Sequence, residues 1–420
     1  MKKILPPIML FLCVFALLQC CLPYTFLSWE EHGLFLHTPD WRSEVFSGSL
    51  PLVTYVTSWI VQFFHYPMVG AALIAFGTTL IFLLLCVLMP KARKAIWIVF
   101  ALLLIAGVCV LGTNKAIREI ERWAKLEHVA QKKKWNEVLA IATPERAKKD
   151  RRMMPYALLA LSEKGELANR MFTYPILGVE DFLYVDWYSR ESGFFNSLFY
   201  ESFGSVNEAV HQTFQSATYL PHGTSFGTLR RLVLLYRKQG NDTLADKYAT
   251  ILNQSTLHNY SLGKRANVSG EGAPDSIDSL KQTSAKASLI TRDAFYNVGQ
   301  MLAQGHITQA NVDRFLCMAL ANRDLKIFYR ALKLYVDIKR PLPKHYQEAL
   351  LLLLSSFDDS VDISEVKIDE GVRNAFETER NRDTFFGYYF SVPQQNGGGN
   401  PIEPSGQNAS RQGSGFKVGS

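Results

Sequence analysis

The sequence predicts an all-α membrane protein with transmembrane helices at the N-terminus, an α-solenoid of tetratricopeptide type behind them, and a disordered C-terminal tail. Three observations carry this prediction. Uncharged apolar runs lie within residues 1–112 of the 420-residue chain, and helical periodicity with little strand-like alternation fills the middle. Residues 394–420 are rich in Gly, Ser, Asn and Gln, with almost no large apolar side chain to bury.

Two apolar runs define the membrane region. MVGAALIAFGTTLIFLLLCVLM covers residues 68–89 and AIWIVFALLLIAGVCVL covers residues 95–111, with only PKARK between them. A helix needs roughly 20 apolar residues to cross a bilayer core about 30 Å thick, and both runs are close to that length. The sequence therefore predicts a transmembrane hairpin with a tight turn at residues 90–94.

A third apolar run starts the chain, after Lys2 and Lys3, and reaches Leu22. A signal peptide and a signal anchor share this form. The residues Leu18, Gln19 and Cys20 lack the small side chains that precede a cleavage site. We therefore expect a retained transmembrane helix at about residues 4–22, with the two lysines in the cytoplasm.

Residues 23–50 read as a polar loop on the outer side, because they carry several acidic residues and the single basic residue Arg42. Some membrane glycosyltransferases place a catalytic carboxylate in their first external loop, which makes Glu30, Glu31 and Asp40 candidates for that role. No second catalytic element is visible, so a solvated acidic loop is the preferred interpretation.

Residues 51–66, PLVTYVTSWIVQFFHY, are short for a span and carry polar side chains, which favours an interfacial or re-entrant segment that ends at Pro67. The chain then crosses the membrane three times, PKARK joins Lys2 and Lys3 inside, and the soluble domain is external. If residues 51–66 span instead, the domain is cytoplasmic. Basic residues just after Leu111 support this second topology, but we adopt the first.

Residues 114–393 are expected to form the helical-repeat domain, with a polar insert at 255–288 and a tail from 394. The clearest repeat unit, residues 226–253, has a helix, a turn at Gly240 and a second helix in which small Ala245 permits close approach. A helix, broken once, is expected over residues 112–150. Its apolar spacing predicts a buried stripe of Ala116, Ile117, Ile120, Trp123 and Ala124.

Charge and cysteine usage limit the function classes. The net charge is +7, but many of the lysines and arginines flank the apolar runs, where such residues set membrane topology. The lipid bilayer is therefore the expected partner, and nucleic acid is not. Five of the six cysteines lie in or beside the apolar runs, which leaves only Cys317 in the soluble part and no disulfide framework there. His211, His222 and His258 have no acidic or cysteine companion at ligand spacing.

The sequence contains no P-loop, dinucleotide-binding, HExxH or GxSxG motif. We therefore predict no catalytic, cofactor-binding or metal-ligating residue and no cofactor, and enzyme activity is unsupported.

Two stretches resemble an uncharacterised family of bacterial multi-pass membrane proteins known mainly from Bacteroidetes. One is LFLHTPDW with QFFHYPMVGA, and the other runs from LALSEKGELANRMFTYP through FFNSLFYESFGSVNEAVHQTFQSATYLP to LRRLVLLYRKQGNDTLADKYATIL. The resemblance implies an inner-membrane location and a tetratricopeptide-like domain, brings no catalytic residues, and marks the membrane half as shorter than is usual in the family.

The resulting hypothesis is a membrane-anchored helical-repeat scaffold of the bacterial envelope, multi-pass in the inner membrane, whose periplasmic domain binds a protein partner in the solenoid groove. The alternative is a membrane-embedded glycosyl-type transferase, or its accessory subunit, that uses the first-loop carboxylates.

Overall fold

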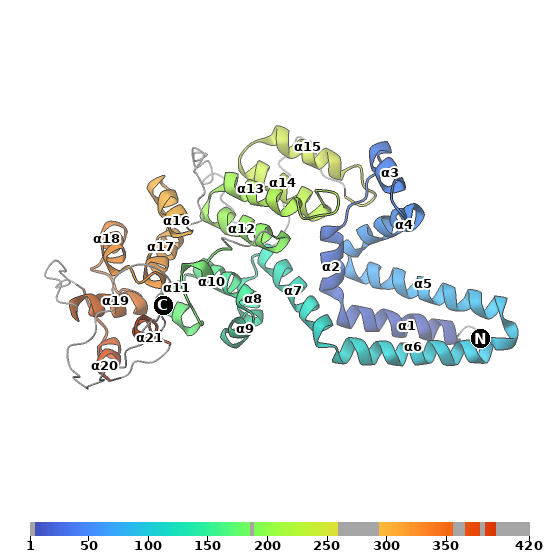
Figure 1. Ribbon diagram of the computed structural model, residues 1–420, viewed down its shortest axis with the longest axis horizontal. Coiled ribbons are helices and arrows are strands. Elements are labelled where there is room, and N and C mark those ends of the chain that lie inside the picture. Colours follow the sequence, from blue (N-terminus) through green and yellow to red (C-terminus); the bar gives the residue numbers. More distant parts are fainter. Residues whose placement is uncertain (1–4, 185–188, 259–293, 356–365, 379–382, 392–420) are drawn as a thin grey trace, which may run out of the picture. The chain divides into compact units, whose positions relative to one another are not determined.

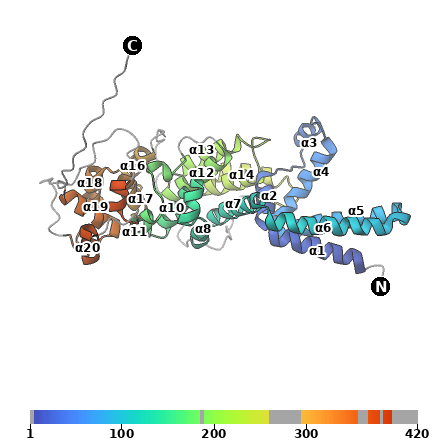
Figure 2. The ribbon, with the colours of Figure 1, turned by 60° about the horizontal axis from the view of Figure 1, so that its bottom comes forward.

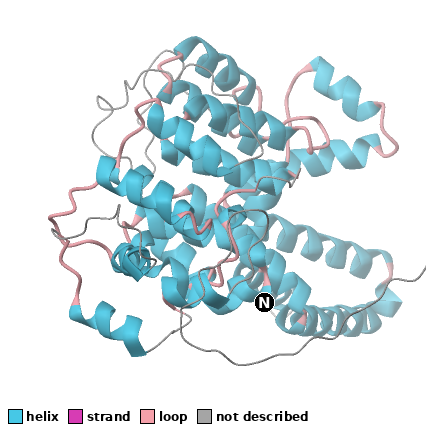
Figure 3. Cartoon of the chain, turned by 60° about the vertical axis from the view of Figure 1, so that its left-hand side comes forward, coloured by secondary structure: helices cyan, strands magenta, loops and turns pink. Residues whose placement is uncertain are grey.

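A computed structural model describes residues 5–184, 189–258, 294–355, 366–378 and 383–391 (Figure 1). These residues form helices and no strand (Figure 3), which confirms the predicted all-α class. Contacts divide the chain into two compact units, Met1–Asp324 and Leu325–Ser420. Most of the predicted polar insert, from residue 259 to 288, and the predicted tail at 394–420 lie outside the described residues, so both stay predictions.

The predicted hairpin is present as two helices, α5 (Pro67–Leu88) and α6 (Arg93–Thr113), joined by a 3-10 turn at Pro90–Ala92. The two helices meet at this turn and run back from it (Figure 1, Figure 2), and each is long and apolar enough to cross a membrane. α5 begins at the proline where a break was predicted, because Tyr66 before it is extended, with φ −112° and ψ 98°.

The first apolar run forms α1 (Leu5–Cys21), which packs against α5 and α6. α1 has 17 residues and continues, through a bend of 76°, into α2 (Pro23–His32). Only when α1 and α2 are taken together are they long and apolar enough to be a candidate membrane span. The helix at residues 4–22 is thus confirmed as a helix, and its crossing of the membrane stays a prediction.

The polar loop predicted over residues 23–50 is wrong, because α2 and α3 (Pro39–Phe46) occupy most of it. Each begins with proline, which is favourable at a first helical position although it breaks a helix interior. Residues 51–66 form α4 (Pro51–Val61) and a 3-10 turn at Gln62–His65. α4 has 11 residues, of which none is buried, so an interfacial or re-entrant position remains the expectation for it.

The domain part of the first unit consists of consecutive helices that pack on their neighbours, among them α12 on α13 and α14 on α15. Its longer described helices are α7 (Lys115–Gln131), α8 (Trp135–Ile141), α9 (Pro144–Lys149), α10 (Met154–Glu163), α12 (Arg190–Phe203), α13 (Val206–Ala217), α14 (Phe226–Lys238), α15 (Asp242–Leu252), α16 (Ala294–Ala303) and α17 (Gln309–Ala321).

The predicted helix–turn–helix unit is α14 and α15. Gly240 between them has φ +73°, a left-handed conformation that glycine adopts without strain, and Ala245 is fully buried. The larger solenoid arrangement stays a prediction.

The buried stripe predicted at the start of α7 is wrong in part. Ala124 is buried, but Ala116 is exposed and Ile120 is 57 % exposed, because this part of α7 borders a cavity. Residues 182–203 are rich in aromatic side chains, and Phe195, Phe199 and Tyr200 of α12 are buried in the core. Trp187 and Tyr188 lie outside the described residues.

The segment between α2 and α4 packs onto the domain rather than extending into solvent. Phe35 and Trp41 belong to one buried cluster with Phe226 of α14 and Leu252 of α15. Burying two aromatic side chains against two domain helices removes a large apolar area from water. The N-terminal segment and the domain therefore share a hydrophobic core.

The second unit contains α18 (Leu325–Tyr335), α19 (Lys344–Ser355), α20 (Glu370–Thr378) and α21 (Phe385–Ser391). The other three helices contact α19. Glu348 of α19 is fully buried and accepts a hydrogen bond of 2.8 Å from the backbone N–H of Phe385, while Nδ1 of His345 lies 2.8 Å from it. This buried carboxylate joins α21 to α19 through one of its two oxygens.

Candidate functional site

The candidate site is built around α2, which lies outside the two candidate spans. Its Glu30 is fully buried and receives two hydrogen bonds from Arg230 of α14, at 2.5 and 2.7 Å. His258 Nε2 lies 3.0 Å and His65 Nδ1 3.6 Å from the same carboxylate. Burial by itself favours the neutral acid, but the Arg230 guanidinium and the two rings outweigh it and hold the pKa of Glu30 well below its usual range.

The other end of α2 is held by α7. Glu121 accepts hydrogen bonds from the backbone N–H groups of Tyr24 and Thr25, at 2.9 and 2.8 Å, and from the Thr25 hydroxyl at 2.6 Å. The first N–H groups of a helix have no partner within it, so a carboxylate from another helix serves as the cap. Two helices of the domain thus hold α2, one near each end.

A third junction joins the turn before α5 to the chain after α15. Gln62 is fully buried, and its side chain donates to the Thr256 hydroxyl at 3.1 Å and accepts from the Thr256 N–H at 3.0 Å. The backbone N–H of His37 donates to the carbonyl of Gln254 at 2.8 Å. These bonds fix the start of α5 relative to the domain.

The three candidate carboxylates differ in burial and in their partners. The solvated interpretation is wrong for Glu30, which is paired and buried, whereas Asp40 is exposed in the first turn of α3. Glu31 is half-buried beside Glu30, and its withdrawal from water raises its pKa to about 7, with the Arg230 charge opposing and the Glu30 charge reinforcing the shift. The structure therefore brings Glu30 and Glu31 together on α2 and leaves Asp40 on another helix.

The histidines also have acidic companions that short sequence spacing does not show. His258 lies beside Glu30, and His222 Nδ1 is 2.8 Å from Glu44 of α3. Only the Glu208 companion of His211, at 3.5 Å, is close in sequence. Among the described residues no group of three His, Cys, Asp or Glu side chains is arranged to hold a metal ion.

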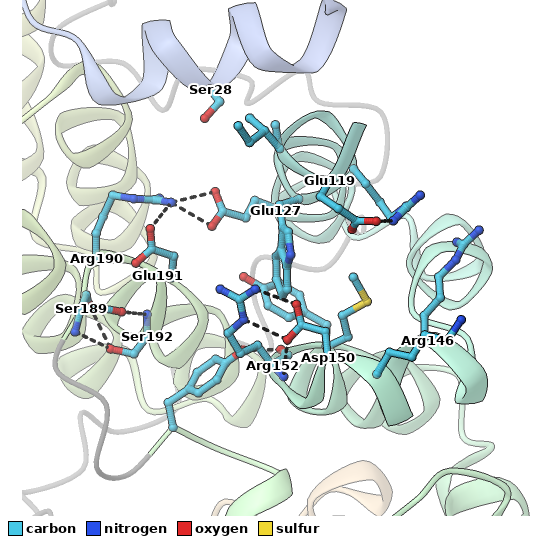
Figure 4. A pocket seen from close by; sticks show the side chains of 18 of the residues that line it. Ser28, Glu119, Glu127, Arg146, Asp150, Arg152, Ser189, Arg190, Glu191 and Ser192 are labelled. Atoms are coloured by element: carbon cyan, nitrogen blue, oxygen red, sulfur yellow. Dashed lines mark hydrogen bonds and ion pairs between the residues drawn. The ribbon is translucent and has the colours of Figure 1, made fainter. Parts of the chain in front are cut away.

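A cavity of about 810 Å³ lies between α7, α9, the start of α12 and Ser28 of α2 (Figure 4). Arg190 reaches across it to Glu127 and to Glu191, each at 3.0 Å. Burial raises the pKa of Glu127 above its usual value, and the Arg190 charge opposes that shift. This ion pair closes one side of the cavity.

The floor of the cavity is formed by Arg152 and Asp150, which share hydrogen bonds of 2.9 and 2.6 Å (Figure 4). The same guanidinium lies over the Trp123 ring, 4.8 Å from its centroid. Aromatic faces beside fixed polar groups are typical of small-molecule sites, and the volume is within the usual range for such sites. No sequence pattern indicated this cavity, because its walls come from segments far apart in the chain.

A family model described as a family of unknown function, DUF6057, matches residues 1–118 and 115–379. The search of curated proteins and the search of solved structures each returned no match. The two matched ranges cover the membrane helices, the α2 junction, the cavity and most of the domain. The chain therefore belongs to the DUF6057 family.

Proposed function

We propose that the protein is a membrane-anchored scaffold of the bacterial envelope whose helical domain presents a tetratricopeptide-like solenoid surface to another envelope protein. The observation that carries this proposal is the attachment of α2 by Glu121 near one end and Arg230 near the other. Both partners belong to the domain. The domain is therefore attached to the N-terminal helices by fixed side-chain contacts and not only by a flexible linker. Packed helix pairs in a fixed orientation are suited to binding a peptide or a partner helix.

The same contacts support three crossings and an external domain. Residues 24–62 bond to α7, to α14 and to the chain after α15, so they lie on the same side of the membrane as the domain. A hairpin of α5 and α6 returns the chain to that side without a further crossing at residues 51–66. The basic turn with Lys91, Arg93 and Lys94 then faces the cytoplasm, and the domain lies in the periplasm beside the inner membrane.

Photo-crosslinking in intact cells tests the scaffold role with the full chain. A crosslinking amino acid at Phe214 or Tyr219, which are 39 % and 47 % exposed on the domain, is expected to capture one reproducible partner. The control position is Lys91 in the hairpin turn, which should not capture it. Arg230→Ala weakens the attachment of α2 to α14. It should therefore lower the crosslinking yield while protein levels stay normal. Absence of a common partner at every domain position would overturn the proposal.

A C-terminal reporter tests the topology. Alkaline phosphatase fused after Ser420 should be active, since it folds only in an oxidising compartment, and a fluorescent protein at the same point should stay dark. The reverse pattern would mean that the domain is cytoplasmic.

One observation favours the transferase alternative. A Glu31 carboxyl with a pKa of about 7 is suited to general acid–base catalysis near neutral pH. Glu31→Gln preserves the shape of the side chain, and Asp40→Asn at an exposed position of α3 is the matched control. Loss of the cellular phenotype with Glu31→Gln alone, at normal protein levels, would support the transferase. Equal behaviour of the two variants would remove Glu31 as a catalytic group.

A further inference from the structure

One rim of the cavity lies close in the chain to the end of the second candidate span. Ala116 and Ile120 line it, three and seven residues after Thr113, the last residue of α6. Asn114 between α6 and α7 is extended, so α7 does not continue the axis of α6, but these short chain separations keep both positions near the end of the span. The headgroup layer extends roughly 5 to 8 Å beyond the hydrocarbon core. The exposed Ile120 side chain therefore offers an apolar contact beside the membrane surface.

The charged walls of the cavity divide into paired and unpaired groups. Arg122, Arg152 and Arg190 each bond to a carboxylate that also lines the cavity. Two further cations come from α9 and bond to no carboxylate among the described residues. Arg146 donates through Nη1 to the carbonyls of Ala140 and Ile141, and Lys149 is exposed with no bond to any described residue.

The positions of these two cations suit an anion. Arg146 and Lys149 are three residues apart on one helical turn, so their side chains lie on the same face, and both line the cavity. A planar guanidinium beside an ammonium group matches the several oxygens of a phosphate ester. The four carboxylates that line the cavity are already paired with arginines, which leaves Arg146 and Lys149 as lining cations without a carboxylate partner among the described residues.

We infer that this cavity binds the phosphate group of a phospholipid headgroup, with Arg146 and Lys149 as its cationic ligands and Ile120 against the adjoining apolar part. A soluble phosphate ester would use the same cations but would gain nothing from the apolar rim beside the membrane. The inference does not depend on the scaffold role, because it requires only that α6 ends at the membrane surface.

Native mass spectrometry of the full-length protein in a phosphate-free maltoside detergent tests the site. The probes are dihexanoyl phosphatidylglycerol, dihexanoylglycerol without phosphate, and glycerol 3-phosphate without acyl chains. The phospholipid should bind at least tenfold more tightly than either other probe. Equal binding of dihexanoylglycerol would overturn the phosphate site, and equal binding of glycerol 3-phosphate would overturn the lipid as the ligand.

Neighbouring lysines on α9 provide the matched control. Lys149→Gln should weaken phospholipid binding about tenfold, as expected for the loss of a charge-assisted hydrogen bond. Lys148→Gln removes the same charge from an exposed residue that does not line the cavity, and should change binding less than twofold. Arg146→Gln should behave like Lys149→Gln, with circular dichroism to verify folding. Equal affinities for the two lysine variants would overturn the inference.

Discussion

Glu30 and Arg230 are 200 positions apart in the chain and form a bidentate ion pair, with N–O distances of 2.5 and 2.7 Å. The Glu30 side chain is 1 % exposed and that of Arg230 16 % exposed. Geometry of this kind compensates the cost of removing a carboxylate from water. The pair connects α2, which follows α1, to α14 of the domain, so its loss should destabilise both segments.

Arg230→Ala should lower the free energy of unfolding by about 3–5 kcal/mol, because it leaves the Glu30 carboxylate buried without its main partner. Denaturant unfolding of the full chain in detergent measures this. Arg340→Ala is the control, since its ion pair with Asp337 is highly exposed, and it should cost less than about 1 kcal/mol. The double variant Glu30→Gln with Arg230→Met should recover part of the loss. Equal effects of Arg230→Ala and Arg340→Ala would contradict the role of the pair.

Stability should depend on pH through Glu31. Its pKa rises from an ordinary value of 4.5 to about 7 on folding, so the folded protein holds a proton that the unfolded chain releases. The stabilisation is complete below about pH 4.5 and is lost as the pH rises toward 7. Glu31→Gln should flatten this part of a stability profile measured by thermal unfolding. An unchanged slope between pH 4.5 and 7 would show that Glu31 does not titrate in this way.

Glu30 should act in the opposite direction. Its pKa is lowered on folding, so its contribution is present above the ordinary carboxyl pKa and is lost as the pH falls below it. Glu30→Gln should therefore reduce the acid sensitivity of the protein below about pH 4 while lowering its stability at neutral pH. Unfolding curves at pH 3 and pH 7 compare the two effects, and a variant as acid-sensitive as the wild type would contradict the prediction.

Gly227→Ala should destabilise the protein by about 1–3 kcal/mol, as overpacking does. A Cβ atom there would lie 2.8 Å from the backbone oxygen of Glu31, which cannot move aside as a side chain would. Gly371→Ala is a matched control, because it also occupies the second position of a helix but meets no atom within 4 Å. The control should be neutral or slightly stabilising. Similar melting temperatures for the two variants would contradict the close contact between α2 and α14.

Arg314 of α17 should tolerate neither lysine nor methionine. It is 1 % exposed, donates through Nε to the Ser162 hydroxyl at 2.7 Å and pairs with Glu163, so its planar fork joins α17 to the end of α10. Both substitutions should lower the free energy of unfolding by about 3–5 kcal/mol, because lysine lacks the planar fork and methionine lacks both the fork and the charge. Lys326→Met at an exposed position should stay within about 0.5 kcal/mol. A stable Arg314→Lys variant would show that charge alone suffices.

The sequence was sufficient for features that depend on local composition. The spans of α5 and α6 follow from uninterrupted apolar runs, and the α14–α15 unit follows from Gly240 and from the spacing of its apolar residues. Periodicity reports which side of a helix is apolar, but it does not report what covers that side. Ile120 fits the apolar pattern of α7 and yet is exposed, because a cavity lies beside it.

The junction at α2 could not be predicted for a different reason. Glu30 looked like a solvated acid because its neighbours in sequence are acidic and aromatic, while its partner Arg230 lies far along the chain. His258 appeared to have no acidic companion for the same reason. Ion pairs between distant segments leave no periodic signal in a single sequence, so neither the buried carboxylate nor the cavity could be located before the fold was known.

The contacts that hold α2 and its neighbours can form only in the order in which their partners are synthesised. The amides of Tyr24 and Thr25 can be capped only after Glu121 has emerged from the ribosome. Glu30 can form its ion pair only after Arg230 has been synthesised. Gln62 acquires its partner later still, when Thr256 has left the ribosome. Residues 24–62 therefore lack these partners while the apolar helices that flank them are being inserted, and their contacts with the domain can form only after Thr256 has been synthesised.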